Sequence, residues 1–249
     1  MIRNEANLGG KRVKYYEAGK GEAVLLLHGA GATARLWRKQ MGPLSELFRV
    51  LAPDLPGFGG TDVFPEINDV KGYAGFLAAF LENAGISRVS LVGSSLGGWV
   101  ACWFALVYPE KIDKLVLVSP AGVYLSEDPP MTMQRLLEEI KLLYGATAGS
   151  GQDKSAVGEL EKGLSTFKRL YDGGGLEPDL SGVLSMIKAA TLIIWGDEDH
   201  VIPLPYAGVF GAGIKNSRVN IIKGAGHLPY TEKPAVFNKT VSDFLKEAA

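Results

Sequence analysis

The residues best placed to do chemistry lie in segment 93–97, which reads Gly-Ser-Ser-Leu-Gly and follows a short apolar run. A Gly-x-Ser-x-Gly pattern between a buried strand and a helix is typical of a serine in a strained turn with its hydroxyl exposed. The flanking residues must be small because larger side chains would collide there. Segment 98–107 is apolar nearly all round, as a buried helix would be. The pattern predicts Ser95 as a nucleophile, with an ordinary glycine-rich turn as the alternative.

A serine nucleophile needs a general base, and the base needs a carboxylate that fixes its tautomer. The chain has three histidines. His227 lies in a glycine-rich loop after a strand-like segment, and the carboxylates at 197–199 follow an earlier apolar run. His200 is the poorer base because it is adjacent in the chain to these carboxylates, and His28 precedes the serine. We therefore predict His227 as the base and one of residues 197–199 as the acid.

With its candidate residues in the order serine, acid, histidine, the chain resembles the α/β-hydrolase family. The resemblance implies an α/β fold with a mainly parallel central sheet, helices on both faces and a short helical cap. It spans residues 24–230. Its four motifs are His28-Gly29-Ala30-Gly31, the Asp-Leu-Pro-Gly-Phe-Gly of 54–59, the serine turn at 93–97, and the Gly-Asp-Glu-Asp-His-Val-Ile-Pro of 196–203 followed by His227.

The resemblance also selects the acid. In related sequences the acid is the aspartate separated by one residue from an apolar pair and a proline, which here is Asp199. Asp197 and Glu198 are then interpreted as a solvated turn. Some relatives place the acid after the preceding strand instead, but here no carboxylate follows that strand before Glu127.

An ester carbonyl attacked by Ser95 becomes an oxyanion, which needs two hydrogen-bond donors already aimed at it. One is expected to be the backbone N–H of Leu96, directly after the nucleophile. The resemblance implies Ala30 as the second donor. His28 and Asp54 are interpreted as structural residues of the loops that surround this site.

Composition bounds the possible partners. The net charge is −1, which offers no basic surface for nucleic acid, and 47% hydrophobic residues suffice for a large core. A single cysteine, Cys102, excludes an internal disulfide and is expected to be buried. The chain opens without an apolar signal segment and contains no apolar run of membrane-spanning length. We expect a cytoplasmic protein with neither nucleic acid nor membrane as a partner.

Apolar runs without alternation predict buried strands of a parallel sheet, whereas an alternating run predicts an antiparallel edge near the N-terminus. Helical periodicity marks two further segments. The buried runs are 23–28, 88–93, 114–119 and 191–196, the alternating run is 11–17, and the helical segments are 70–84 and 236–245.

This pattern stops after Pro120. We predict that residues 1–120 and 187–249 form the hydrolase core and that residues 121–186 form a helical cap, with helices at 131–144 and near 153–171. The alternative is a solvated helical excursion with no gating role. Glycines in this segment would allow a hinged lid.

A rival interpretation uses Gly-Ala-Gly-Ala-Thr-Ala at 29–34 with Asp54 as a dinucleotide-binding fingerprint, which would make the chain an NAD-dependent oxidoreductase. It leaves Ser95, Asp199 and His227 unexplained. A third interpretation is a hydrolase fold used only as a binding module.

Within the family, the serine nucleophile argues against dehalogenase and epoxide-hydrolase chemistry, which use aspartate at this position. The preferred function is cleavage of small carboxylic esters with an apolar portion, by acyl transfer without metal or organic cofactor. Carbon–carbon hydrolases of aromatic ring-cleavage products are the main alternative, but they typically carry tryptophan after the histidine, where this chain has Leu228. Perhydrolase, lactonase and acyltransferase activities share the same motifs.

Overall fold

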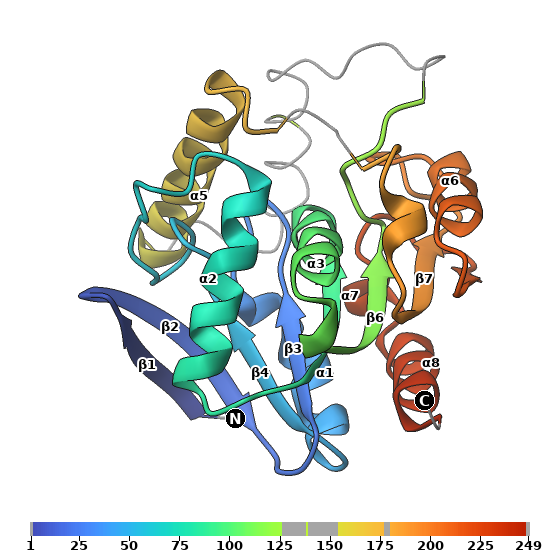
Figure 1. Cartoon of the computed structure of the whole chain (residues 1–249), viewed down its shortest axis with the longest axis horizontal. Coiled ribbons are helices and arrows are strands. Elements are labelled where there is room, and N and C mark those ends of the chain that lie inside the picture. The colour runs from blue at the N-terminus through green and yellow to red at the C-terminus, as the bar shows by residue number, and fades with distance from the viewer. Residues whose placement is uncertain (1, 126–137, 139–153, 177–179, 248–249) are drawn as a thin grey trace.

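A computed structural model describes residues 2–125, 138, 154–176 and 180–247 of the chain. Within these ranges the strands form one sheet in the order β1-β2-β4-β3-β5-β6-β7-β8 (Figure 1). The strands are β1 (Ile2–Leu8), β2 (Lys11–Ala18), β3 (Ala23–Leu27), β4 (Arg49–Pro53), β5 (Val89–Ser94), β6 (Ile112–Val118), β7 (Ala190–Gly196) and β8 (Ser217–Ile222).

Helices lie on both faces of this sheet, and α5 lies beyond its edge (Figure 1). α2 packs against α3 in front of the sheet in Figure 1, and α1, α7 and α8 contact one another. The α-helices are α1 (Arg38–Ser45), α2 (Val70–Asn83), α3 (Leu96–Val107), α5 (Lys154–Asp172), α6 (Pro205–Gly213), α7 (Pro229–Glu232) and α8 (Pro234–Lys246). Short 3-10 helices are η1 (Ala34–Trp37), η2 (Pro109–Lys111) and η3 (Leu184–Met186).

The predicted fold class is confirmed. Strands β4, β3, β5, β6, β7 and β8 are mutually parallel, and the apolar runs of β3, β5, β6 and β7 are buried almost throughout. A strand covered by helices on both faces has no solvated side, which explains why these runs do not alternate. The sheet brings the carboxyl ends of β3, β5, β6 and β7 to one edge, where the candidate residues lie.

The N-terminal edge differs from the prediction. The alternating segment folds as β2 and pairs antiparallel with β4, but it is not the edge of the sheet. β1 pairs with the other side of β2 and forms the edge. Its sequence was not recognised as a strand because it buries little more than Ala6, so polar side chains hide the alternation.

The predicted second helix of the cap segment corresponds to α5, whereas the predicted helix at 131–144 lies almost entirely outside the described residues. Side chains on one face of α5 hold it to the segment after β4. Thr166 Oγ1 donates to the Gly57 carbonyl at 2.8 Å, and Lys162 Nζ donates to the Gly59 carbonyl at 3.3 Å. Arg169 donates to the Ile67 carbonyl at 3.1 Å. Their spacing of four and three residues places the three donors on one face of the helix.

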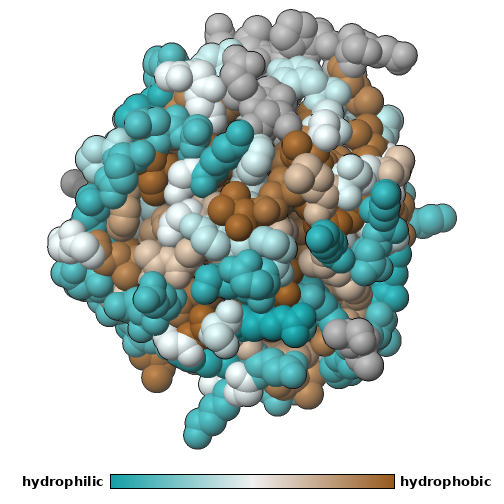
Figure 2. All heavy atoms as spheres, viewed as in Figure 1, coloured by the Kyte–Doolittle hydropathy of each residue, from teal (hydrophilic) through white to brown (hydrophobic). Residues whose placement is uncertain are grey.

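The face of the molecule seen in Figure 2 is mainly polar, with hydrophobic residues in small groups among charged ones. Exposed hydrophobic residues scattered in this way are ordinary on protein surfaces. In the ranges that the structure describes, no helix combines the length and apolar character that a membrane span requires.

Glycines permit the close backbone contacts that bring the strand ends together. A Cβ on Gly97, in the first turn of α3, would lie 2.4 Å from the carbonyl oxygen of Leu27 at the end of β3. A Cβ on Gly93 would lie 2.3 Å from the carbonyl oxygen of Gly97. The turn around Ser95 can therefore approach the loop after β3 only without side chains at these positions.

We predict that Gly97→Ala lowers the free energy of unfolding by about 1–3 kcal/mol, because its methyl group must displace the backbone of β3. Gly75→Ala is the matched control, since Gly75 also lies in a helix but a Cβ there meets nothing within 4 Å. Gly75→Ala should stabilise the protein by about 0.5–1 kcal/mol through helix propensity. Urea unfolding monitored by circular dichroism measures both changes, and equal effects of the two substitutions would contradict the contact.

Candidate functional site

Ser95 occupies the turn between β5 and α3 in a backbone conformation that few side chains adopt. Its φ is 53° and its ψ is −117°, and Ser95 is partly exposed to solvent. Its N–H donates to the Val118 carbonyl, and its own carbonyl accepts from the N–H of Trp99 and of Ala121. Such strain typically costs about 1–3 kcal/mol and persists where the surrounding structure enforces it. The structure thus presents Ser95 at a rigid turn, as the sequence pattern predicts.

Asp199 and His227 form a buried pair at the same edge of the sheet. His227 Nδ1 lies 2.9 Å from Asp199 Oδ2, and both side chains are almost completely shielded from solvent. An ionised carboxylate only accepts hydrogen bonds, so Nδ1 carries the proton and Nε2 is left as the basic nitrogen. Among the described residues, the hydroxyl of Ser95 makes no hydrogen bond.

Asp199 is held in its ionised form by the groups around it. Burial favours the neutral acid, but the hydrogen bond and charge of His227 together with the Ile202 N–H and the Ser119 hydroxyl outweigh it and lower the pKa of Asp199. The second oxygen, Oδ1, accepts from the N–H groups of Val201 and Ile202, each at 2.9 Å. These bonds fix the carboxylate whose other oxygen contacts His227.

His200 is not brought into this pair. It is exposed, while the carboxylate of the adjacent Asp199 faces His227. The sequence argument that a neighbour in the chain cannot turn toward the acid agrees with this placement.

The loop that carries His227 is held by carboxylates that sequence reasoning missed. Glu232 Oε2 accepts from the Gly226 N–H at 2.7 Å, and Glu232 Oε1 accepts from the Leu228 N–H at 3.0 Å. One side chain therefore binds the backbone on both sides of His227. The available signal was an acidic residue in the short helix that follows the histidine loop, where free amide groups need acceptors.

Asp197 has a second role in the same loop. It is exposed, as a solvated turn residue would be, but its Oδ1 also accepts from the Gly224 N–H at 2.7 Å. The backbone N–H of Glu198 donates to the Ala225 carbonyl at 2.9 Å. The turn after β7 thus contributes Asp199 and also fixes the loop of His227.

The two predicted oxyanion donors lie on either side of the close contact between α3 and β3. Leu96 is the first residue of α3, and Ala30 follows the end of β3 in a buried loop. Within the described ranges, no hydrogen bond to another backbone group uses the N–H of either residue. The first amide groups of a helix have no partner inside it, so that of Leu96 can bind an anion.

His28 and Asp54 connect this loop to the segment after β4. The Leu55 N–H donates to His28 Nε2 at 2.9 Å, so the proton is on Nδ1, which donates to the Gly29 carbonyl at 2.8 Å. Burial lowers the pKa of His28 and keeps the ring neutral. Asp54 accepts from the N–H groups of Ala34 and Gly60. Both of its oxygens are thus bound to backbone N–H groups, which agrees with the structural role expected for Asp54.

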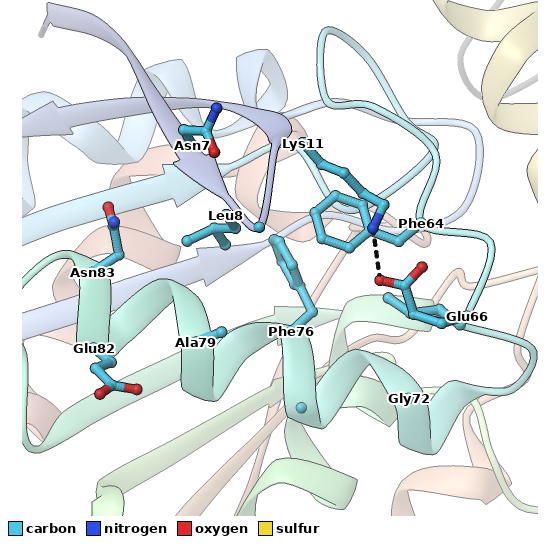
Figure 3. A pocket seen from close by; sticks show the side chains of 13 residues that line it. Asn7, Leu8, Lys11, Phe64, Glu66, Gly72, Phe76, Ala79, Glu82 and Asn83 are labelled. Carbon is cyan, nitrogen blue, oxygen red and sulfur yellow. Dashed lines mark hydrogen bonds and ion pairs between the residues drawn. The ribbon is translucent and has the colours of Figure 1, made fainter.

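A pocket of about 620 Å³ lies away from these residues, between the β1–β2 turn and α2 (Figure 3). Its rim includes the Lys11–Glu66 ion pair at 3.0 Å. None of the predicted site residues lines it, so it is not the pocket that would present a substrate to Ser95. It is lined by Asn7, Leu8, Gly9, Lys11, Phe64, Glu66, Ile67, Gly72, Gly75, Phe76, Ala79, Glu82 and Asn83.

Comparison with known proteins identifies the family of this chain. The sequence profile of the alpha/beta hydrolase family matches residues 24–240. A 2-hydroxy-6-oxo-6-phenylhexa-2,4-dienoate hydrolase of Comamonas testosteroni is 31% identical over 98% of this chain and 94% of its own length. The chain therefore belongs to the alpha/beta hydrolase family.

Two solved structures are similar over nearly the whole chain. A meta-cleavage product hydrolase from Pseudomonas fluorescens IP01 has 25% identity and a TM-score of 0.80, and the match covers 99% of this chain and 98% of that one. A membrane phospholipase A described as a bacterial virulence factor has 27% identity and a TM-score of 0.80, covering 98% and 85%. Similar structures therefore include hydrolases named for two different reactions.

We predict that Glu232→Ala lowers kcat/KM about tenfold, because two amide groups beside His227 lose a charged acceptor and the loop loses its fixed geometry. Glu232→Gln should fall between this variant and the unchanged protein, since one amide oxygen can replace only one of the two acceptors. Steady-state kinetics on an activated ester measures the effect.

Glu198→Gln is the matched control, because Glu198 is also exposed but contributes its backbone to the loop. It should retain near-full activity. Thermal unfolding of all three variants separates a local effect from global destabilisation, and a Glu232→Ala protein with unchanged kinetics would show that the loop does not depend on this carboxylate.

Proposed function

We propose that this chain is a serine hydrolase that cleaves carboxylic esters through an acyl-enzyme intermediate. The observation that carries the proposal is the buried hydrogen bond between Asp199 and His227 at the sheet edge where Ser95 is held in a strained turn. Nucleophilic catalysis by serine requires this set of groups: a hydroxyl, a neutral imidazole and a carboxylate that fixes its tautomer.

In the proposed reaction His227 Nε2 takes the proton of Ser95 as the hydroxyl oxygen attacks the ester carbonyl. Asp199 stabilises the imidazolium that forms. The N–H groups of Ala30 and Leu96 hold the oxyanion. When the tetrahedral intermediate collapses, the ester C–O bond breaks and His227 donates its proton to the departing alcohol. Water, activated by the same histidine, then attacks the acyl-serine and releases the carboxylic acid and free Ser95.

We further propose that residues 121–186 act as a cap over this site and that the substrate has an apolar portion. The hydrogen bonds of Thr166, Lys162 and Arg169 to backbone carbonyls support a fixed position for the α5 part of the cap. A fixed cap helix contributes to pocket shape and excludes water without needing to move. α5 therefore does not have to move as part of a hinged lid, which the glycines of this segment would allow.

The second candidate function is hydrolysis of a carbon–carbon bond in an aromatic ring-cleavage product. The observation that favours it is the similarity to the dienoate hydrolase and to the meta-cleavage product hydrolase. This reaction differs in its leaving group, since the proton must go to carbon instead of the oxygen of an alcohol. Leu228, a buried residue after His227, departs from the tryptophan of that group.

A substrate panel distinguishes the two functions. It contains p-nitrophenyl and methyl esters of different acyl length and one ring-cleavage dienoate, with the Ser95→Ala variant as the background control. Preference for esters by kcat/KM supports the first candidate. Preference for the dienoate supports the second, and turnover of neither, with Ser95→Ala indistinguishable from the unchanged protein, contradicts both.

We predict that an organophosphonate modifies Ser95 alone. Ser95 lies at the sheet edge that carries the buried pair, in a strained and partly exposed turn, whereas Ser94 is completely buried. Intact-mass measurement should show one adduct, and peptide mapping should place it on Ser95. Modification of Ser94, or ester turnover without any adduct, would contradict the assignment.

We predict that Asp199→Asn lowers kcat by up to about four orders of magnitude, because an amide in place of the carboxylate no longer fixes the tautomer of His227 or stabilises the imidazolium. Asp197→Asn is the control. Its side-chain oxygen can still accept from the Gly224 N–H, so its activity should stay near that of the unchanged protein. Kinetics with circular dichroism checks both, and the reverse ranking would show that the wrong aspartate was selected.

A further inference from the structure

The cap helix α5 contacts the loop after β3 at Gly163. This glycine is buried, and a Cβ on it would lie 2.9 Å from Phe58 Cδ1 and 3.4 Å from the Cα atom of Gly31. Carbon atoms that are not bonded to each other pack at about 3.5–4.0 Å, so the first of these distances is a clash. The helix can therefore lie this close to Phe58 and to the loop only because residue 163 has no side chain.

Phe58 joins α5 to the ring of His28. Both residues are completely buried, and their rings meet edge to face with centroids 5.4 Å apart. The Phe58 N–H donates to the Leu55 carbonyl at 2.8 Å, and the Leu55 N–H donates to His28 Nε2 at 2.9 Å. A close-packed interior transmits such a displacement to its neighbours. A methyl group at position 163 would therefore displace Phe58 and disturb its contact with His28.

His28 in turn holds the turn that carries Ala30. Its Nδ1 donates to the Gly29 carbonyl at 2.8 Å, and the same carbonyl accepts from the Ala32 N–H at 3.2 Å. These bonds close a tight turn from Gly29 to Ala32, the Ala30 turn, with Ala30 and Gly31 at its centre. The φ of Gly31 is 70°, which favours glycine. α5 thus meets the Ala30 turn directly at Gly31 and also through Phe58 and His28.

We propose that Gly163 is a positioning residue of the cap, which lets α5 hold the Ala30 turn so that the Ala30 N–H stays where an oxyanion requires it. The inference rests on the proposed function, because Gly163 acts through an oxyanion donor of that mechanism. It gives α5 a part in the chemistry as well as in the shape of the pocket.

The test compares two glycines inside α5. Gly163→Ala adds a methyl group against Phe58, whereas Gly158→Ala is the matched control, because Gly158 is exposed and a Cβ there meets nothing within 4 Å. A third variant, Thr166→Val, keeps the side-chain shape but removes the hydroxyl that donates to the Gly57 carbonyl at 2.8 Å. Since Gly57 directly precedes Phe58, this variant loosens the same contact without adding volume.

Two measurements are made on each protein. The first is kcat/KM on p-nitrophenyl acetate. The second is the inhibition constant of phenylboronic acid, which reports binding of a transition-state analogue. Boron binds the Ser95 oxygen while the serine proton passes to His227, which leaves a tetrahedral boronate whose oxygen needs the oxyanion donors.

In Gly163→Ala we expect kcat/KM to fall and the inhibition constant to rise, each about tenfold, because a displaced donor costs less than the factor of about 10²–10³ for a donor that is removed. Thr166→Val should change both quantities in the same direction by a smaller factor. Gly158→Ala should change neither.

Urea unfolding followed by circular dichroism establishes that each variant is folded under the assay conditions. Parallel changes of kcat/KM and the inhibition constant in folded Gly163→Ala support the positioning role. An unchanged inhibition constant overturns it, even where the variant is less stable, since a purely structural role alters unfolding alone. If Gly163→Ala does not fold, Thr166→Val decides by the same criterion. If the unchanged protein neither hydrolyses the ester nor binds phenylboronic acid, the proposed function is contradicted and this inference with it.

Discussion

The close contact between the first turn of α3 and the end of β3 fixes the geometry on which the candidate site depends. Gly97 leaves no room for a side chain against the Leu27 carbonyl. The contact joins the end of β3, which leads to the loop of Ala30, to the first turn of α3, directly after the strained Ser95. In the proposed mechanism the oxyanion donors are backbone N–H groups, which such a contact keeps in place.

The second half of the site depends on electrostatics. Asp199 remains ionised in a buried place because His227 and backbone N–H groups bind both of its oxygens. Glu232 and Asp197 then fix the loop of His227 from outside. The exposed carboxylates of Glu232 and Asp197 thus hold the loop that carries His227, and His227 in turn binds the buried carboxylate of Asp199. The pair keeps its geometry although His227 lies in a loop.

Local sequence patterns predicted the parallel strands, the turn of Ser95 and a carboxylate of residues 197–199 beside His227, and the family resemblance selected Asp199 among them. A strand buried on both faces must be apolar, and a sharp turn between strand and helix must contain small residues. The role of Glu232 was missed although an acidic residue in the short helix after the histidine loop was an available signal. That signal does not say which backbone N–H groups the side chain binds, because this depends on how the loop folds around it. The edge position of β1 was missed because its polar residues mask the alternation.

The attachment of α5 has a consequence for which residues of this chain can vary. Three of its side chains donate to main-chain carbonyls, those of Gly57, Gly59 and Ile67. Every amino acid supplies such a carbonyl, so these three bonds alone place little constraint on residue identity in the segment after β4, apart from Gly57, where a Cβ would meet Thr166. The helix itself must carry hydrogen-bond donors at three positions on one face. The side chains on the other faces of α5 take no part in these three hydrogen bonds, so they can change without loss of this attachment.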